Sequence, residues 1–115
     1  MKKIVFDSDG LIKLVKSGIF KKIQQEIFIS EEVYQETVTA GKKGFHDDAQ
    51  IIGQYIEEKK IIVKKNKTTK NIYGLGKGEA SAFSLFEEMK VYAIISDDRK
   101  FLAVLEQENI PFIVP

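Results

Sequence analysis

Short apolar runs that alternate with amphipathic stretches are the feature that most constrains the fold of this chain. The runs are as short as buried strands, and the stretches between them repeat apolar residues at the spacing of helices. Strands that alternate with helices favour a parallel sheet covered on both faces. The expected strands are residues 3–6, 27–29, 61–64, 92–96 and 112–114, and the expected helices are residues 11–17, 31–39, 47–59, 78–89 and 99–107.

We therefore predict an α/β protein in which residues 1–115 form a single domain. Its architecture is a three-layer α/β/α fold with a doubly wound parallel sheet of about five strands. The last expected strand ends just before Pro115, so we expect the helix that closes such a sheet to be missing from this chain.

Composition excludes several classes of function. The chain has no cysteine, which rules out disulfides and thiolate metal sites and agrees with a cytoplasmic protein. No apolar stretch is long enough for a signal peptide or a membrane span, so we expect no membrane partner. The net charge of +1 gives no general attraction to nucleic acid, which leaves only local basic patches for that purpose.

Acidic residues recur where strands of this sheet are expected to end. Asp7 follows the first strand, and Asp97 and Asp98 follow the fourth; Glu36 lies in the helix after the second strand, and Glu79 opens the helix after a glycine-rich stretch. Sites in open parallel sheets form at the carboxyl ends of the strands, so we expect these acids to converge. Two carboxylates about 4 Å apart repel by roughly 4 kcal/mol at an effective dielectric near 20. Such a cluster without histidine or cysteine favours Mg²⁺ or Mn²⁺, which promote phosphodiester cleavage.

Two serine or aspartate residues are expected to cap helices. Ser30 precedes two glutamates at the start of the second helix, and Asp9 precedes the first helix in DGLIKL, where a cap is the expected role and an extra acid of the site is the alternative. Between residues 64 and 78 the sequence is basic, rich in glycine and without periodicity, which predicts a surface loop or a basic lip over a site for a polyanion. The residues considered for RNA binding there are Lys65, Lys67, Lys70, Tyr73 and Lys77.

The motif FDSDGL resembles the first motif of the haloacid dehalogenase phosphatases. In that interpretation Asp7 is the nucleophile and Asp9 is the acid. Leu11 stands where that family has its phosphate-binding threonine, and no convincing lysine motif follows. A small phosphatase stays open as an alternative.

Nearly the whole chain resembles the PIN-domain ribonucleases, in particular the short prokaryotic type related to VapC toxins. The segments VFDSDGLIKLVKSG, ISEEVYQETV, GKGEASAFSLF and AIISDDRKFLAVLEQENIPF occur in the order and spacing of that family. The resemblance implies a metal-dependent endoribonuclease for single-stranded RNA that holds one or two Mg²⁺ or Mn²⁺ ions. Its catalytic acids fall on Asp7, Glu36, Glu79 and Asp98, with Asp97 also eligible as a metal ligand; alignment of Ser96 with the family's threonine favours Asp98.

The same resemblance implies partners as well as chemistry. A toxin of this type would have an antitoxin protein that blocks the acidic site, and it would form a homodimer. A catalytically inactive or truncated binding module with the same fold is the second alternative.

Overall fold

The computed structural model describes residues 2–39, 47–68 and 74–115, in which five parallel strands form one sheet. The strands are β1 (Lys3–Phe6), β2 (Glu26–Ser30), β3 (Ile61–Lys64), β4 (Ala93–Ile95) and β5 (Phe112–Ile113), in the order β3-β2-β1-β4-β5. The central strand β1 pairs Val5 with Phe28 of β2 and with Ile94 of β4. Because the chain moves outward from β1 first on one side and then on the other, the sheet is doubly wound, as predicted.

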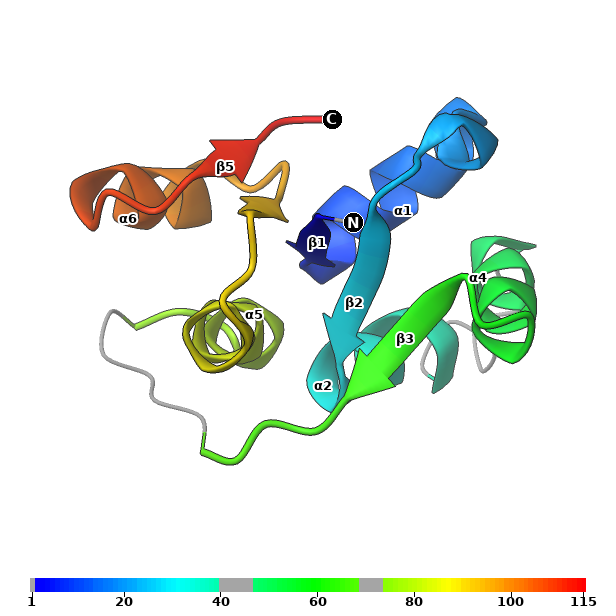
Figure 1. Cartoon of the computed structure of the whole chain (residues 1–115), viewed down its shortest axis with the longest axis horizontal. Coiled ribbons are helices and arrows are strands. Elements are labelled where there is room, and N and C mark those ends of the chain that lie inside the picture. Colours follow the sequence, from blue (N-terminus) through cyan, green and yellow to red (C-terminus); the bar gives the residue numbers. More distant parts are fainter. Residues whose placement is uncertain (1, 40–46, 69–73) are drawn as a thin grey trace.

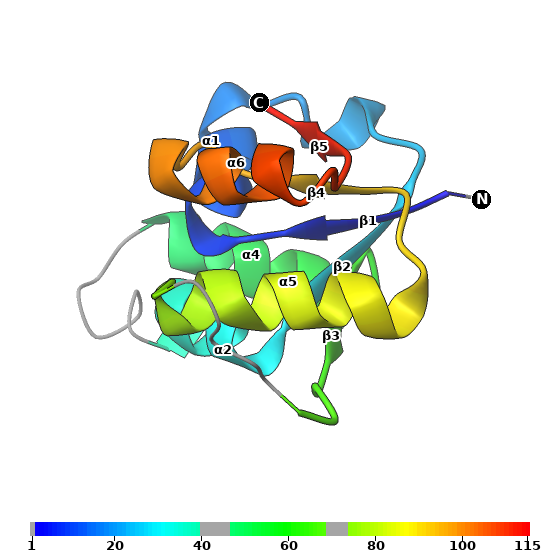
Figure 2. The ribbon, with the colours of Figure 1, turned by 90° about the vertical axis from the view of Figure 1, so that its left-hand side faces the viewer.

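Helices cover both faces of the sheet, which confirms the three-layer prediction (Figures 1 and 2). On one face lie α1 (Ser8–Ser17) and α4 (Asp47–Glu57), and on the other lie α5 (Lys77–Met89) and α6 (Arg99–Gln107). Three short elements flank β2: the 3₁₀ helix η1 (Phe20–Lys22), the single turn α2 (Glu31–Tyr34) and the π-helical segment η2 (Gln35–Thr39). No helix in the described part of the chain has the length and apolar character needed to cross a membrane.

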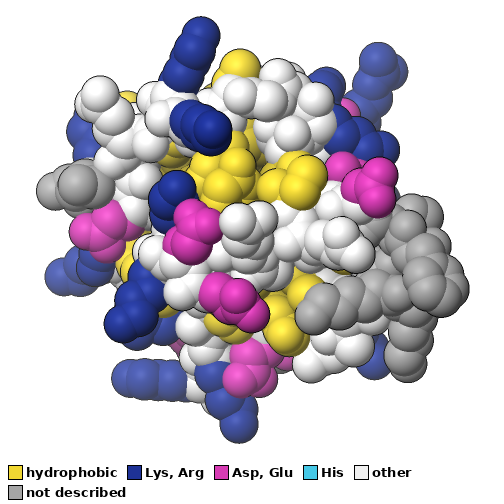
Figure 3. Space-filling view, turned by 90° about the vertical axis from the view of Figure 1, so that its right-hand side faces the viewer, with side chains coloured by type: hydrophobic (Ala, Val, Ile, Leu, Met, Phe, Trp, Pro, Cys, Tyr) yellow, Lys and Arg dark blue, Asp and Glu magenta, His cyan; other side chains and the backbone are white. Residues whose placement is uncertain are grey.

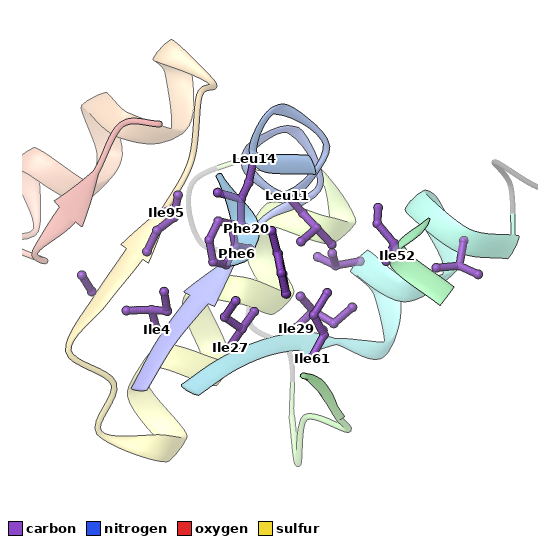
Figure 4. Close-up of a cluster of buried hydrophobic side chains, with 13 residues drawn as sticks. Ile4, Phe6, Leu11, Leu14, Phe20, Ile27, Ile29, Ile52, Ile61 and Ile95 are labelled. Carbon is purple, nitrogen blue, oxygen red and sulfur yellow. The ribbon is translucent and has the colours of Figure 1, made fainter. Parts of the chain in front are cut away.

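Two buried apolar clusters, one on each face, hold β1 in the centre of the molecule. Ile4 and Phe6 join the cluster beneath α1 and α4, which Figure 4 shows. Val5 joins the cluster beneath α5 and α6. This alternation follows from the two-residue period of a strand, and burial on both faces explains why β1 reads as an unbroken apolar run. The strand that ends just before Asp7 is therefore held by packing on both faces.

The first helix begins three residues earlier than predicted, because Asp7 and not Asp9 is its N-cap. The Asp7 carboxylate accepts a hydrogen bond from the Gly10 N–H at 2.8 Å. The prediction that Asp9 caps this helix is wrong: Asp9 lies within the first turn, so its carboxylate makes no cap. The predicted cap at Ser30 is confirmed, since its hydroxyl accepts the Val33 N–H at 3.1 Å.

The predicted helix 31–39 divides into one α-helical turn and the π-helical segment η2. Thr37 donates its hydroxyl to the Val33 carbonyl at 2.8 Å, which competes with the regular helical hydrogen bond to that oxygen. The helix predicted to reach residue 59 ends at Glu57, because Lys59 takes a left-handed conformation with φ of 61°. The other boundaries match the prediction or differ by one residue.

Candidate active site

The acids predicted from the sequence converge on a small polar pocket at the carboxyl edge of the sheet. Its volume is about 110 Å³, and it lies where α1, α5 and α6 begin. Asp7, Glu36, Glu79 and Asp98 all reach it, although they come from four different segments. The residues that line the pocket are Asp7, Ser8, Asp9, Glu36, Gly76, Gly78, Glu79 and Asp98.

Asp7 is the most enclosed of these acids, with 1% of its surface exposed. One carboxylate oxygen accepts the Gly10 N–H, and the other accepts a short hydrogen bond from the Ser96 hydroxyl. Burial, helped by the negative charges of Asp9 and Glu79, raises the pKa of Asp7 to about 7, although the two hydrogen bonds oppose the shift. A positive charge brought into the pocket would therefore favour the ionised form of Asp7.

Glu36 reaches the pocket from η2, and two neighbours fix its position. Ser8 donates its hydroxyl to Glu36 Oε1 at 2.7 Å. Gly78 lies against the same carboxylate so closely that a Cβ at this position would overlap Oε1. The absence of a side chain at residue 78 is therefore what lets Glu36 lie in the pocket. Ser81 donates to the Gly78 carbonyl at 2.7 Å and so holds the glycine in place.

Glu79 occupies the first turn of α5 and has one engaged and one unengaged oxygen. Its Oε1 accepts the Gly76 N–H at 3.1 Å, whereas Oε2 is buried without a hydrogen-bond partner among the described residues. Burial raises the pKa of Glu79, and the charges of Asp98 and Asp9 add to the rise. A buried carboxylate oxygen without a partner is costly unless a proton or a cation binds there.

Asp98 is both a structural cap and a member of the pocket. Its carboxylate accepts the Phe101 N–H at 3.1 Å and so caps α6. Its own N–H donates to the Ser96 hydroxyl at 3.1 Å, and the same hydroxyl donates to Asp7. Ser96 thus joins two acids that follow neighbouring strands.

The structure puts Asp9 inside the pocket and Asp97 outside it. Asp97 is exposed, lies outside the pocket lining and pairs with Lys13 at 3.2 Å. Asp9, which was expected to cap a helix, lines the pocket. Ser8, Gly10 and Gly78 also belong to the site, although no motif in the sequence assigns them to it. These residue types are common at helix starts, and only their contacts with Asp7 and Glu36 reveal their role.

The cations considered for RNA binding are not equally close to the pocket. Lys77 is the first residue of α5, next to the pocket-lining Gly76 and Gly78. The backbone N–H of Lys67 donates to Glu88 at 2.8 Å, nine residues beyond Glu79 and so about 13 Å farther along α5. Lys65 is exposed, and Lys70 and Tyr73 lie outside the described residues.

One cation near the pocket was not identified from the sequence. Lys100, in the first turn of α6, is close enough to Glu79 to oppose the rise in its pKa. It lies two residues beyond Asp98, at the same helix start.

The donor set of the pocket fits a hard divalent cation. Aspartate and glutamate carboxylates supply the charged oxygen donors that line it. The Oε2 atom of Glu79 is buried and has no hydrogen-bond partner among the described residues, so it is available as an acceptor. As they stand, no three histidine, aspartate or glutamate side chains among the described residues are arranged to hold one metal ion. Asp7 and Glu36 instead bind Ser96, Gly10 and Ser8, so ion binding requires rearrangement of carboxylate oxygens.

Comparison with known proteins identifies the family. Residues 3–113 match a family described as a PIN domain (DUF3368). No protein among the curated ones matches the sequence.

Two solved structures share the fold at low sequence identity. One is a PilT N-terminus domain protein from the hyperthermophilic archaeon Sulfolobus solfataricus, with a TM-score of 0.68 and 14% identity, covering 97% of this chain and 86% of that one. The other is a domain of a functionally unknown protein from Methanocaldococcus jannaschii, with a TM-score of 0.64 and 17% identity, covering 100% and 91%. The fold and the match over residues 3–113 together establish that the chain belongs to the PIN-domain family.

Proposed function

We propose that this protein is a metal-dependent endoribonuclease that cleaves single-stranded RNA at the acid pocket. PIN domains are generally nucleases that use divalent metal ions. The observation that carries the proposal is the convergence of Asp7, Glu36, Glu79 and Asp98 on one pocket, with a buried oxygen of Glu79 left without a partner. These four residues would hold Mg²⁺ or Mn²⁺, which when bound supplies water activation and neutralises charge that develops on the phosphodiester.

The chain's own residues position the acids for this role. Ser96 orients the Asp7 carboxylate, and Ser8 orients that of Glu36, so that two acids from different elements keep fixed directions. Gly78 leaves the space that Glu36 occupies. The first turns of α5 and α6 direct their backbone N–H groups toward the same region, which favours a phosphate group beside the acids.

The RNA backbone would be held by cations around the pocket. Lys77 and Lys100 lie at helix starts beside the acids, and the exposed Lys65 and Lys67 join the proposal from the segment that follows β3. Lys70 and Tyr73 belong to the same proposal through the sequence alone. Phosphate contacts of this kind weaken as the salt concentration rises.

Partners beyond RNA follow from the likeness to VapC toxins. The proposal includes an antitoxin that covers the acid pocket and a homodimer of this chain. Co-expression with a neighbouring small gene product and sedimentation of the purified protein test these two partners separately.

The test of the proposed function is cleavage of a labelled single-stranded RNA with Mn²⁺, with Mg²⁺ and with EDTA. We expect metal-dependent cutting that Asp7→Asn, Glu79→Gln and Asp98→Asn each reduce by roughly a hundredfold or more, since metal ions contribute several kcal/mol to such reactions. Glu106→Gln, an exposed acid on α6, is the matched control and should leave the rate unchanged. Asp97→Asn should lose much less than Asp98→Asn, because Asp97 lies outside the pocket.

Other results would redirect the assignment. Turnover of p-nitrophenyl phosphate alone, with an aspartyl-phosphate on Asp7, would establish the phosphatase instead. A folded protein that binds RNA but shows no turnover with either metal would make it a binding module.

A further inference from the structure

A second and larger cleft lies at the opposite, amino edge of the sheet. It opens between η1 and the turn that joins α4 to β3, and its volume is about 530 Å³. Figure 3 shows hydrophobic side chains gathered in the middle of this side of the molecule, with lysine and acidic side chains around them. The volume falls in the range of about 300–1,000 Å³ that is typical of small-molecule sites.

The floor of this cleft is apolar and already formed. Phe20 and Ile27 are almost fully buried, while Ile23 and Ile62 are half-buried and present apolar surface to the cleft. The ring of Phe20 stacks on Tyr55 with the centroids 3.9 Å apart and the planes 5° from parallel. One wall is therefore fixed by packing, and an apolar ligand would enter without reorganisation of the core.

The rim of the cleft is cationic. Lys21, Lys59 and Lys60 line it, against a single acid, Glu26. Lys60 pairs with Glu58 at 3.1 Å, but Lys21 and Lys59 form no ion pair within residues 2–39, 47–68 and 74–115. Two unpaired ammonium groups beside an apolar floor favour a ligand with one negative charge and an apolar body.

Lys59 has a left-handed backbone conformation, with φ of 61°, in which glycine would make the folded protein more stable. The Lys59 N–H donates to Ile56 at 3.0 Å and the Lys60 N–H donates to Tyr55 at 2.9 Å, which is the hydrogen-bond pattern of a Schellman helix end. The residue in the left-handed conformation of this motif is usually glycine, and a residue with a Cβ costs about 1 kcal/mol there. The ammonium group of Lys59 is thus present at the rim despite a cost in stability.

We propose that this cleft binds a small apolar monoanion, a carboxylate or sulfonate with an aliphatic or aromatic body. The body would lie against Phe20, Ile23 and Ile62, and the anionic group would lie beside Lys21 and Lys59. The cleft is separated from the acid pocket by the length of the sheet, so this site does not depend on the proposed nuclease function.

The test compares three ligands with the same eight-carbon chain: octanoate, octanol and octylammonium. The folded protein, labelled at isoleucine methyl groups, is titrated with each ligand and followed by NMR. We expect saturable shifts at Ile23, Ile27 and Ile62, with the lowest Kd for octanoate and the highest for octylammonium. Equal Kd values for all three ligands, or octanoate shifts confined to other isoleucines, would overturn the proposal.

Matched variants test the cationic rim. Lys59→Gly should raise the Kd for octanoate roughly threefold, as expected for an exposed charge pair. The combination of Lys59→Gly with Lys21→Gln should raise it about tenfold, and neither change should affect the Kd for octanol. Lys90→Gly is the control, because Lys90 ends α5 in the same left-handed conformation (φ 53°) and does not line the cleft. An effect of Lys90→Gly equal to that of Lys59→Gly would contradict a specific site.

Discussion

The two edges of the sheet carry opposite charges and differ in how they bury them. The carboxyl edge, where α1, α5 and α6 begin, has a pocket of about 110 Å³ lined by acids. The amino edge, where α4 ends, has a cleft of about 530 Å³ with an apolar floor and a lysine rim. Carboxylates are favoured at helix N-termini and ammonium groups at C-termini, so the helix dipoles favour the charge that lines the pocket at each edge.

The helix dipoles do not explain why acids are buried at the carboxyl edge while the lysines at the amino edge are exposed. Lysines at the amino edge keep their charges in water, whereas Asp7 is enclosed and Glu79 has a buried oxygen without a partner. Burial without compensation destabilises the folded protein. The carboxyl edge therefore retains an electrostatic cost that a bound cation or a proton would relieve.

The largest expected effect is a fall in stability as pH rises. The pKa of Asp7 is about 7 in the folded protein and near 3.8 without burial, so between these values the folded state holds a proton that the unfolded state has lost. The free energy of unfolding of the metal-free protein should therefore decrease from about pH 4 to about pH 7, by at most ~4 kcal/mol, and then level off. Burial of Glu79 acts in the same direction. Urea denaturation across this pH range in EDTA measures the effect.

Asp7→Asn is the control for this pH dependence. Asparagine keeps an oxygen for the Gly10 N–H and has no charge to bury, so the variant should be more stable than the parent at pH 8 and should lose most of the slope. A parent protein whose stability rises between pH 4 and pH 7 would contradict the burial of an uncompensated carboxylate at this edge.

The next effect concerns the close packing beneath the acid pocket. A Cβ at Gly10 would lie 2.5 Å from the Ile95 carbonyl oxygen and 3.0 Å from Asp7 Oδ1. Because the nearer atom belongs to the backbone of β4, Gly10→Ala should lower the free energy of unfolding by about 2–3 kcal/mol. Gly53 lies inside α4, and a Cβ there would meet only the Val38 side chain at 3.8 Å. Gly53→Ala should therefore raise the free energy of unfolding by up to ~1 kcal/mol. Equal effects of the two changes in urea denaturation would argue against close packing of Gly10 on the β4 backbone.

A smaller effect on stability is expected from Gly78→Ala, together with a large effect on ion binding. The new Cβ would displace the end of the Glu36 side chain, which can swing toward solvent, so the loss of stability should stay below about 1 kcal/mol. Removal of Glu36 from the pocket should weaken Mn²⁺ binding by at least about tenfold. Calorimetric titration with Mn²⁺ measures this, and Ser8→Ala should give a weaker effect of the same sign. Unchanged Mn²⁺ affinity in Gly78→Ala would remove Glu36 from the site.

The sequence predicted the sheet and the set of acids because both depend on local patterns. An apolar run such as Ile4–Phe6 specifies a strand, and the residue after a parallel strand lies at the site edge whatever the details of packing. Asp98 and Glu79 line the pocket for the same local reason, because both lie in or just before a first helical turn.

What the sequence did not predict depends on contacts between distant segments. Asp7 and Asp9 are equally good caps by residue type, and the choice of Asp7 depends on its enclosure between Gly10 and Ser96, 89 residues away. The link from Ser8 to Glu36 and the lack of room at Gly78 likewise exist only after β1, η2 and α5 have packed together. The apolar cleft joins η1 to the α4–β3 turn, and neither segment carries a motif.

The smallest effect tests the amino edge, where we expect almost no electrostatic cost. Lys59→Gly should raise the free energy of unfolding by about 0.5–1 kcal/mol, because glycine takes the left-handed conformation at φ of 61° without opposition from a Cβ. Lys90→Gly should give a similar gain at the end of α5, where φ is 53°. Thermal denaturation at pH 6 and pH 8 measures both variants, and the gain should be the same at the two pH values. A gain at Lys59 that changes with pH, or a loss, would mean that the amino edge also depends on a buried charge, and the contrast between the two edges would fail.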